Sequence, residues 1–165
     1  MKIKSISMFA FSLVLLLLMS TMLTFYMIYA HETFEEGITV SENGVTEAVV
    51  EVRDLNLAPS ESREYVINLV CKASGGYHIT LEYEEQLDGG LKQFVNVAVR
   101  LGEETVYEGR LSKLLSGEEK IQFDGVLEEK TPLPITVIYE MPVSIGNEAQ
   151  GTYADFDVRL KILKS

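Results

Sequence analysis

The chain has 165 residues, with 14 Lys+Arg against 25 Asp+Glu and a single cysteine. Only Lys2 and Lys4 precede residue 31, so residues 31–165 retain 12 Lys+Arg against 25 Asp+Glu, a net charge of -13 over the length of one compact domain. This charge disfavours nucleic acid as a partner, and one cysteine excludes an intrachain disulfide framework.

Residues 1–30 have the pattern of a membrane-targeting segment. Lys2 and Lys4 precede an uncharged run from Ile6 to Ala30, on the order of 25 residues, which is enough to span a bilayer as a helix. Two fates stay open: cleavage near Ala30 as a signal peptide, or retention of residues 6–30 as an N-terminal membrane anchor. In both, the basic start places the rest of the chain outside the cytoplasmic membrane, in the extracellular space or at the cell surface.

Residues 31–44 are expected to be a linker or a donor strand. Phe34, Ile38 and Val40 are apolar, and the last two are spaced as one strand face requires. Asn43-Gly44 could turn this segment back only as a short edge hairpin, so we expect it to pair poorly within its own domain and to join the sheet edge of a neighbouring subunit. A flexible stalk or an ordinary edge strand is the alternative.

From Val45 onward, short alternating apolar runs separated by Gly, Pro, Asn and Asp predict β-strands. The expected strands are 45–56, 65–72, 77–84, 95–101, 105–108, 121–127, 133–141 and 153–163. Residues 110–117 suit a helical turn that ends at Gly117 and crosses between sheets. Roughly eight strands over residues 45–165 predict an all-β, jelly-roll-like β-sandwich. Cys71 shares a strand face with Ile67 and Leu69, which predicts a buried, reduced thiol.

Four stretches carry a family resemblance when their order and spacing are taken together. They are Leu55 to Ser62, Val97 to Leu115, Ile138 to Pro142, and Gly146 to Gly151 leading into Phe156-Asp157. They resemble the TasA/camelysin family of secreted bacterial biofilm-matrix and cell-surface proteins over most of residues 40 to 163. The resemblance implies a jelly-roll-like sandwich, export by an N-terminal signal, and a fibre-forming or surface-associated role. The family's cleavage site is only loosely matched around Ala30.

Part of that family is classed as metallopeptidase, which the residues here support poorly. His31-Glu32-Thr33-Phe34-Glu35 begins like a zinc-binding helix motif, but Glu35 stands where the second histidine is needed. His78, the other histidine, falls on the polar face of a predicted strand. Adjacent carboxylates on a strand point to opposite faces and cannot converge on one substrate; these pairs are Glu103-Glu104, Glu118-Glu119 and Glu128-Glu129. We therefore predict no catalytic residue.

Two further groups of residues have binding chemistry. Asp155 and Asp157, with Glu82 and Glu84, could supply oxygen ligands for calcium, although no loop spaces ligands as an EF-hand does, and we expect no metal or cofactor. Residues 142–151 form the longest polar connection. Its polar side chains either bind a partner or cap the backbone of their own loop. They belong to Asn147, Glu148 and Gln150.

The leading interpretation is a non-enzymatic extracellular structural protein, a surface or biofilm-matrix subunit that self-associates into oligomers or fibres through β-strand edges. The alternative is a monomeric, membrane-tethered binding or accessory domain, and a metallopeptidase is the least supported. Cleavage separates the first two, because a protein that begins near His31 is free to join a fibre and an uncleaved one stays in the bilayer.

Overall fold

The computed structural model describes residues 31–42 and 44–165, with side chains from Glu35 onward. The targeting segment predicted at 1–30 lies outside the described residues, and so do the side chains of His31 and Phe34. Within the described ranges, no helix is long and apolar enough to cross a membrane. Residues Thr33–Ser165 form one compact unit.

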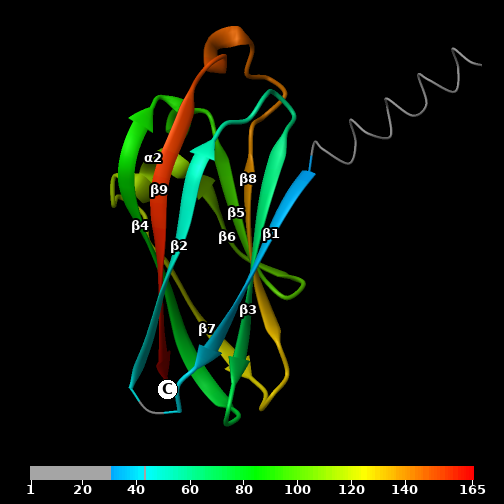
Figure 1. The fold of residues 1–165 in the computed structure, drawn as a ribbon, viewed down its shortest axis with the longest axis vertical. Helices are drawn as coiled ribbons and strands as arrows, with labels where there is room; N and C mark the ends of the chain where they lie inside the picture. Colours follow the sequence, from blue (N-terminus) through cyan, green and yellow to red (C-terminus); the bar gives the residue numbers. More distant parts are fainter. Residues whose placement is uncertain (1–30, 43) are drawn as a thin grey trace, which may run out of the picture. The chain divides into compact units, whose positions relative to one another are not determined.

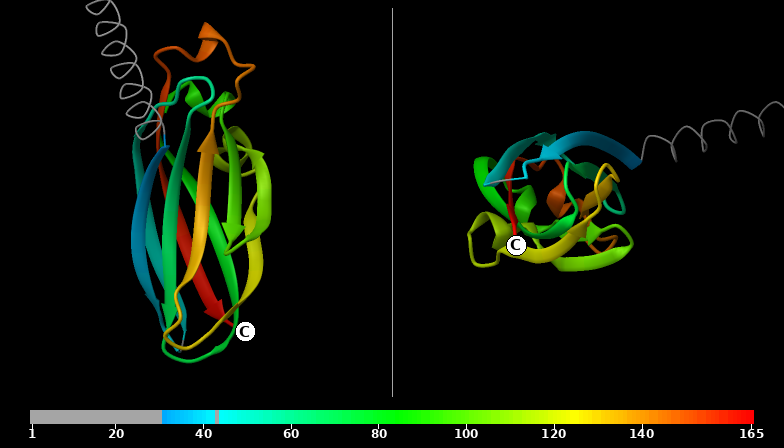
Figure 2. Two further views of the ribbon diagram at one scale, coloured as in Figure 1. Left: turned by 90° about the vertical axis from the view of Figure 1, so that its right-hand side faces the viewer. Right: turned by 90° about the horizontal axis from the view of Figure 1, so that it is seen from below.

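The described residues contain nine strands in two sheets, and the sheets pack face to face (Figures 1 and 2). The five-stranded sheet has the order β1-β3-β8-β5-β6 and the four-stranded sheet the order β2-β9-β4-β7. The strands are β1 His31–Val40, β2 Val45–Leu55, β3 Ser62–Cys71, β4 Gly75–Gly89, β5 Asn96–Leu101, β6 Glu104–Arg110, β7 Ile121–Leu127, β8 Leu133–Glu140 and β9 Tyr153–Lys164. The short helices are η1 Leu91–Gln93, α2 Leu111–Leu115 and η2 Asn147–Ala149.

The strand pairing is nested, as in a long hairpin folded upon itself. Strand β2 pairs with β9, β3 with β8, β4 with β7 and β5 with β6, all antiparallel. This pairing, distributed over two sheets, is the jelly-roll arrangement. The predicted all-β, jelly-roll-like sandwich is therefore confirmed. Helix α2 joins β6 in one sheet to β7 in the other, as expected, and Gly117 follows it with φ +74°.

The ninth strand, β1, corrects an expectation. We expected residues 32–44 to pair poorly within their own domain, with an ordinary edge strand as one alternative, and β1 lies at the edge of the five-stranded sheet beside β3, as in that alternative. The two arrows run in the same direction in Figure 1. The hairpin argument failed because β1 and β2 do not pair with each other: the connection through Gly44, with φ +87°, leads into the other sheet. Ile38 and Val40 are consequently buried, at 9% and 1% exposure.

The core between the sheets follows the predicted alternation. On β9 the inward residues Ala154, Phe156, Val158, Leu160 and Ile162 are all buried. On β3 the buried face ends at Cys71, a free thiol that donates a hydrogen bond to the Glu128 carbonyl at 3.2 Å. The predicted burial of Cys71 is thus confirmed. Tyr139 packs edge-on against Tyr65 and Phe156, with ring centroids 5.7 and 5.4 Å apart.

The third predicted strand extends further than expected. The alternation predicted a strand over 77–84, but β4 continues to Gly89, which pairs with Tyr153. An irregularity between Glu85 and Leu87 shifts the register of β4 against β9, and pairing with β9 continues beyond it. The chain turns only at Gly90, where φ is +87° and the backbone N–H donates to the Asp88 carboxylate at 2.8 Å.

Candidate functional site

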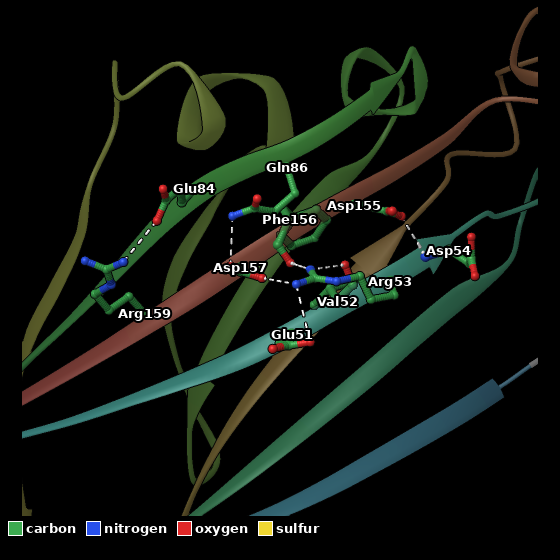
Figure 3. Close-up of polar contacts among 10 residues, drawn as sticks. All are labelled: Glu51, Val52, Arg53, Asp54, Glu84, Gln86, Asp155, Phe156, Asp157 and Arg159. Carbon is green, nitrogen blue, oxygen red and sulfur yellow. Dashed lines mark hydrogen bonds and ion pairs between the residues drawn. The ribbon is translucent and has the colours of Figure 1, made fainter.

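The carboxylates considered for calcium lie on the outward face of the four-stranded sheet, and each has a partner from its own chain. Figure 3 shows Asp155, Asp157 and Glu84 with their partners. Asp157 accepts hydrogen bonds from Arg53 at 2.6 Å and from Gln86 at 2.9 Å. Asp155 accepts from the Asp54 backbone N–H at 2.8 Å. These hydrogen bonds join β9 to β2 at the position where the register between the two strands shifts.

The two glutamates of the same face are paired in the same way. Arg159 donates to Glu84 at 3.0 Å, and Lys161 lies 2.7 Å from Glu82, which lowers the pKa of the Glu82 carboxyl. In the part of the chain that the structure describes, no group of three or more His, Cys, Asp or Glu side chains could hold a metal ion. The geometry of this face is that of ion-paired sheet surface rather than of a cation site.

The residues considered for catalysis are dispersed. His78 is a surface residue on β4, as predicted: its side chain is 45% exposed, and Nδ1 lies 2.9 Å from Asp124. Glu119 accepts hydrogen bonds from Lys113 and Tyr107, both at 2.6 Å, which lower its carboxyl pKa, whereas the adjacent Glu118 is exposed. Nothing in these contacts places an acid and a base on a common substrate position.

A pocket of about 500 Å³ lies between two loops at one end of the sandwich. The β2–β3 connection supplies one wall and the β8–β9 connection, which contains η2, supplies the other. Its lining residues are Asp54, Asn56, Leu57, Ala58, Pro59, Gly146, Asn147, Ala149, Gln150, Gly151, Thr152 and Tyr153. The volume falls in the range of small-ligand sites, about 300–1,000 Å³.

The structure brings two of the three predicted loop residues to this pocket. Asn147 and Gln150 line it and Glu148 does not, although all three are exposed. The turns of this loop are closed by backbone and hydroxyl groups instead: Gln150 N–H donates to the Asn147 carbonyl at 3.1 Å, and the Thr152 hydroxyl to the Ala149 carbonyl at 2.7 Å. Among the described residues, the side chains of Asn147, Glu148 and Gln150 make no hydrogen bond.

The opposite wall is held by a tight turn within the Leu55 to Ser62 stretch. Glu61 closes it twice, because its side chain accepts from the Ala58 N–H at 2.7 Å and its own N–H donates to the Ala58 carbonyl at 2.9 Å. Backbone hydrogen bonds of 3.0 Å from Ser60 to Met141 and from Met141 to Glu61 then join this turn to the start of the other wall. The two walls are thereby fixed relative to each other.

The aromatic member of the pocket, Tyr153, was not among the residues that the sequence singled out. Its ring lies against Gly89 of the paired strand: a Cβ added at residue 89 would approach the Tyr153 ring to 2.6 Å. Asn56 on the facing wall was also missed. Gly89 lies beyond the predicted strand 77–84, and only the β4–β9 register reveals that it makes room for an aromatic ring.

The chain is similar to several solved structures at low sequence identity. No protein-family model and no curated protein matches the chain. PliG of Aeromonas hydrophila, a periplasmic inhibitor of g-type lysozyme, is 15% identical to the chain, with a TM-score of 0.41. The match covers 81% of this chain and 99% of the PliG chain. The CUB1-EGF-CUB2 domains of rat MASP-1 are 10% identical with a TM-score of 0.42, covering 80% and 43%. The pre-peptidase C-terminal domain of Bacillus anthracis collagenase is 10% identical with a TM-score of 0.34, covering 81% and 96%.

Proposed function

We propose that the chain is an exported, non-enzymatic structural protein of the cell surface or extracellular matrix, whose subunits join by exchanging β1. The observation that carries this proposal is the position of β1. It is the terminal strand of the five-stranded sheet, with β3 as its sheet neighbour, and it buries Ile38 and Val40 between the sheets. It is thus an edge strand that can separate from its sheet. The apolar site beside β3 that Ile38 and Val40 fill is called the β1 seat.

Exchange of this strand preserves its contacts. Burial of Ile38 and Val40 contributes about 1.5–3 kcal/mol for each side chain, and β1 from a second copy would fill the same seat beside β3 because the two copies are identical. Only the connection at residues 41–44 must open. A reciprocal exchange closes a dimer, whereas donation from each subunit to the next continues as a filament.

The exposed residues of β1 suit a segment that is free before assembly. Glu35 and Glu36 are exposed on the strand, and Glu42 is exposed just after it. Charges on an edge strand discourage indiscriminate pairing with other sheet edges. A free β1 would therefore stay soluble until it reaches the matching seat of another copy.

Export and the matrix role rest on the sequence. The basic start followed by the uncharged run at 6–30 supports transfer of residues 31–165 across the cytoplasmic membrane. The resemblance to the TasA/camelysin family supports a fibre-forming or surface-associated role. The ion pairs that occupy Glu82, Glu84 and Asp157 support a role without metal-dependent chemistry.

The test compares the protein isolated from outside the producing cells with a variant that lacks residues 31–42. We expect the parent to form concentration-dependent polymers in sedimentation velocity and electron microscopy, and the deletion variant to remain monomeric. A synthetic peptide of residues 31–42 should bind the deletion variant one to one. The matched control peptide carries Ile38→Asp and Val40→Asp, which place charges in the apolar seat and should abolish binding.

A second variant changes only the connection. Insertion of about six Gly/Ser residues after Glu42 should let β1 reach its own β3 more easily and shift the protein toward monomer, because short connections favour exchange. A parent that stays monomeric at high concentration, or a deletion variant that polymerises as well as the parent, contradicts β1 exchange. An intact mass that retains residues 1–30 would then favour the membrane-tethered binding domain.

A further inference from the structure

We propose that the pocket between the β2–β3 and β8–β9 loops binds a neutral oligosaccharide, with Tyr153 as the stacking surface and the amides of Asn56, Asn147 and Gln150 as hydrogen-bonding groups. No described side chain of β1, from Glu35 onward, lines this pocket. The inference therefore goes beyond the assembly proposed above and does not rest on it.

Tyr153 is held as a platform. It pairs with Gly89 across the β4–β9 ladder, and its Cγ and Cδ1 atoms lie 2.7 and 2.6 Å from the point where a Cβ of residue 89 would be. The absence of a side chain at Gly89 lets the ring settle on the neighbouring strand, yet 39% of the residue remains exposed. The C–H face of a pyranose ring stacks on an aromatic ring of this kind, and a ring already fixed loses little conformational entropy on binding.

Three amide side chains of the pocket have free hydrogen-bonding capacity. Asn56, Asn147 and Gln150 are exposed and line the pocket, and among the described residues none of their side chains makes a hydrogen bond. A carboxamide both donates and accepts, as does each sugar hydroxyl, whereas a carboxylate or an ammonium group offers only one of the two roles. Amides beside an aromatic ring therefore match the alternating donors and acceptors of a sugar.

The charge of the pocket selects against acidic ligands. Among the described lining residues, Asp54 is the one ionisable group apart from the Tyr153 phenol, and residues 31–165 carry 12 Lys+Arg against 25 Asp+Glu. An anionic polymer would be repelled by this field and would find no cation in the lining to pair with. The ligand class is accordingly a neutral saccharide.

The pocket is organised before the ligand arrives. The backbone hydrogen bonds that join Ser60 and Glu61 to Met141 fix one wall against the other, and Glu61 holds its own turn. The apolar lining is equally fixed, since Leu57 and Ala149 are buried at 6% and 4% exposure. Such preorganisation reduces the entropic cost of binding.

The experiment is calorimetric titration of the full chain in a zwitterionic detergent without a sugar headgroup, because alkyl glycosides would compete for the pocket. The probes are hexamers of β-1,4-glucose, β-1,3-glucose, β-1,4-N-acetylglucosamine and α-1,6-mannose, with hexagalacturonate as the anionic control. We expect saturable binding of at least one neutral hexamer and none of hexagalacturonate. Absence of binding to all four neutral hexamers, or binding of hexagalacturonate, overturns the proposal.

Variants locate the site. Tyr153→Ala should weaken binding by about tenfold or more, equivalent to about 1.4 kcal/mol, and Tyr153→Phe, which keeps the ring, should stay within about twofold of the parent. Gln150→Ala should weaken binding, whereas the matched control Gln122→Ala, an exposed glutamine on β7 outside the lining, should not. If Tyr153→Ala unfolds, Gln150→Ala and Asn147→Ala decide the question, since neither side chain makes a hydrogen bond to another described residue. Unchanged binding in both overturns the assignment.

Discussion

The hydroxyl of Tyr139 on β8 donates a hydrogen bond to the hydroxyl of Tyr83 on β4, 3.4 Å away, so that one side-chain contact joins the two sheets. The same Tyr139 ring packs on Tyr65 and Phe156. This arrangement separates two contributions to stability: a long hydrogen bond and the burial of a large ring. They can be removed one at a time.

We expect Tyr139→Phe to lower the free energy of unfolding by about 0.5–1.5 kcal/mol, the usual net value of one hydrogen bond. Tyr139→Ala should cost about 3–5 kcal/mol, because it leaves a cavity between the sheets. Urea denaturation followed by circular dichroism measures both. Tyr83→Phe is the matched control: its effect should not add to that of Tyr139→Phe, since both remove the same bond. Equal losses for Tyr139→Phe and Tyr139→Ala would contradict this division.

Alkaline pH should destabilise the sandwich. Burial raises the pKa of Tyr83 and of Tyr139, and burial with the adjacent Glu119 carboxylate raises the pKa of Tyr107. Because the folded state favours the neutral phenol, its contribution is complete below the ordinary tyrosine pKa of about 10 and is lost as the pH rises through the raised values.

The measurement is the urea midpoint against pH, together with phenolate absorbance. The midpoint should decline above pH of about 10, and the phenolate signal of the buried tyrosines should appear with unfolding. Tyr107→Phe should make the alkaline decline shallower. Ionisation of every tyrosine near the ordinary pKa in the folded protein would show that burial does not control these groups.

The thiol of Cys71 should react slowly in the folded protein. The residue is 1% exposed, and its sulfur donates to the Glu128 carbonyl. We expect labelling by a maleimide or disulfide reagent to require unfolding, and to become rapid in urea above the transition. Labelling at equal rates with and without urea would contradict the burial of the thiol.

The turn that builds one pocket wall depends on Glu61. Glu61→Ala removes the acceptor of the Ala58 N–H and should lower the free energy of unfolding by about 1–2 kcal/mol, within the range for a charged group bonded to the backbone. Glu61→Gln, which keeps an acceptor oxygen, should recover most of that loss. Glu118→Ala is a control at an exposed glutamate. Urea denaturation decides, and a loss of the same size for Glu118→Ala would contradict the capping role.

The strands could be predicted because their alternation is local. Ile121–Leu127 begins and ends where the pattern placed it, and the alternate apolar residues of β9, from Ala154 to Ile162, are all buried. The period of two and the glycine stop after the helical turn are properties of a few successive residues, so they need no knowledge of partners. The jelly roll followed from the number and spacing of these runs.

Strand partnership was decided by tertiary structure alone. The sequence of residues 31–44 states that Ile38 and Val40 share a face, and only the sheet order shows that this face is covered by the molecule's own sandwich. Likewise, only its register against Tyr153 shows that Gly89 belongs to strand β4 and not to a turn. The pocket joins residues nearly a hundred positions apart, such as Asn56 and Gln150. Local composition determines which segments become strands and which face turns inward, whereas long-range pairing determines which loops meet, because hydrogen bonds between strands depend on register and not on nearness in sequence.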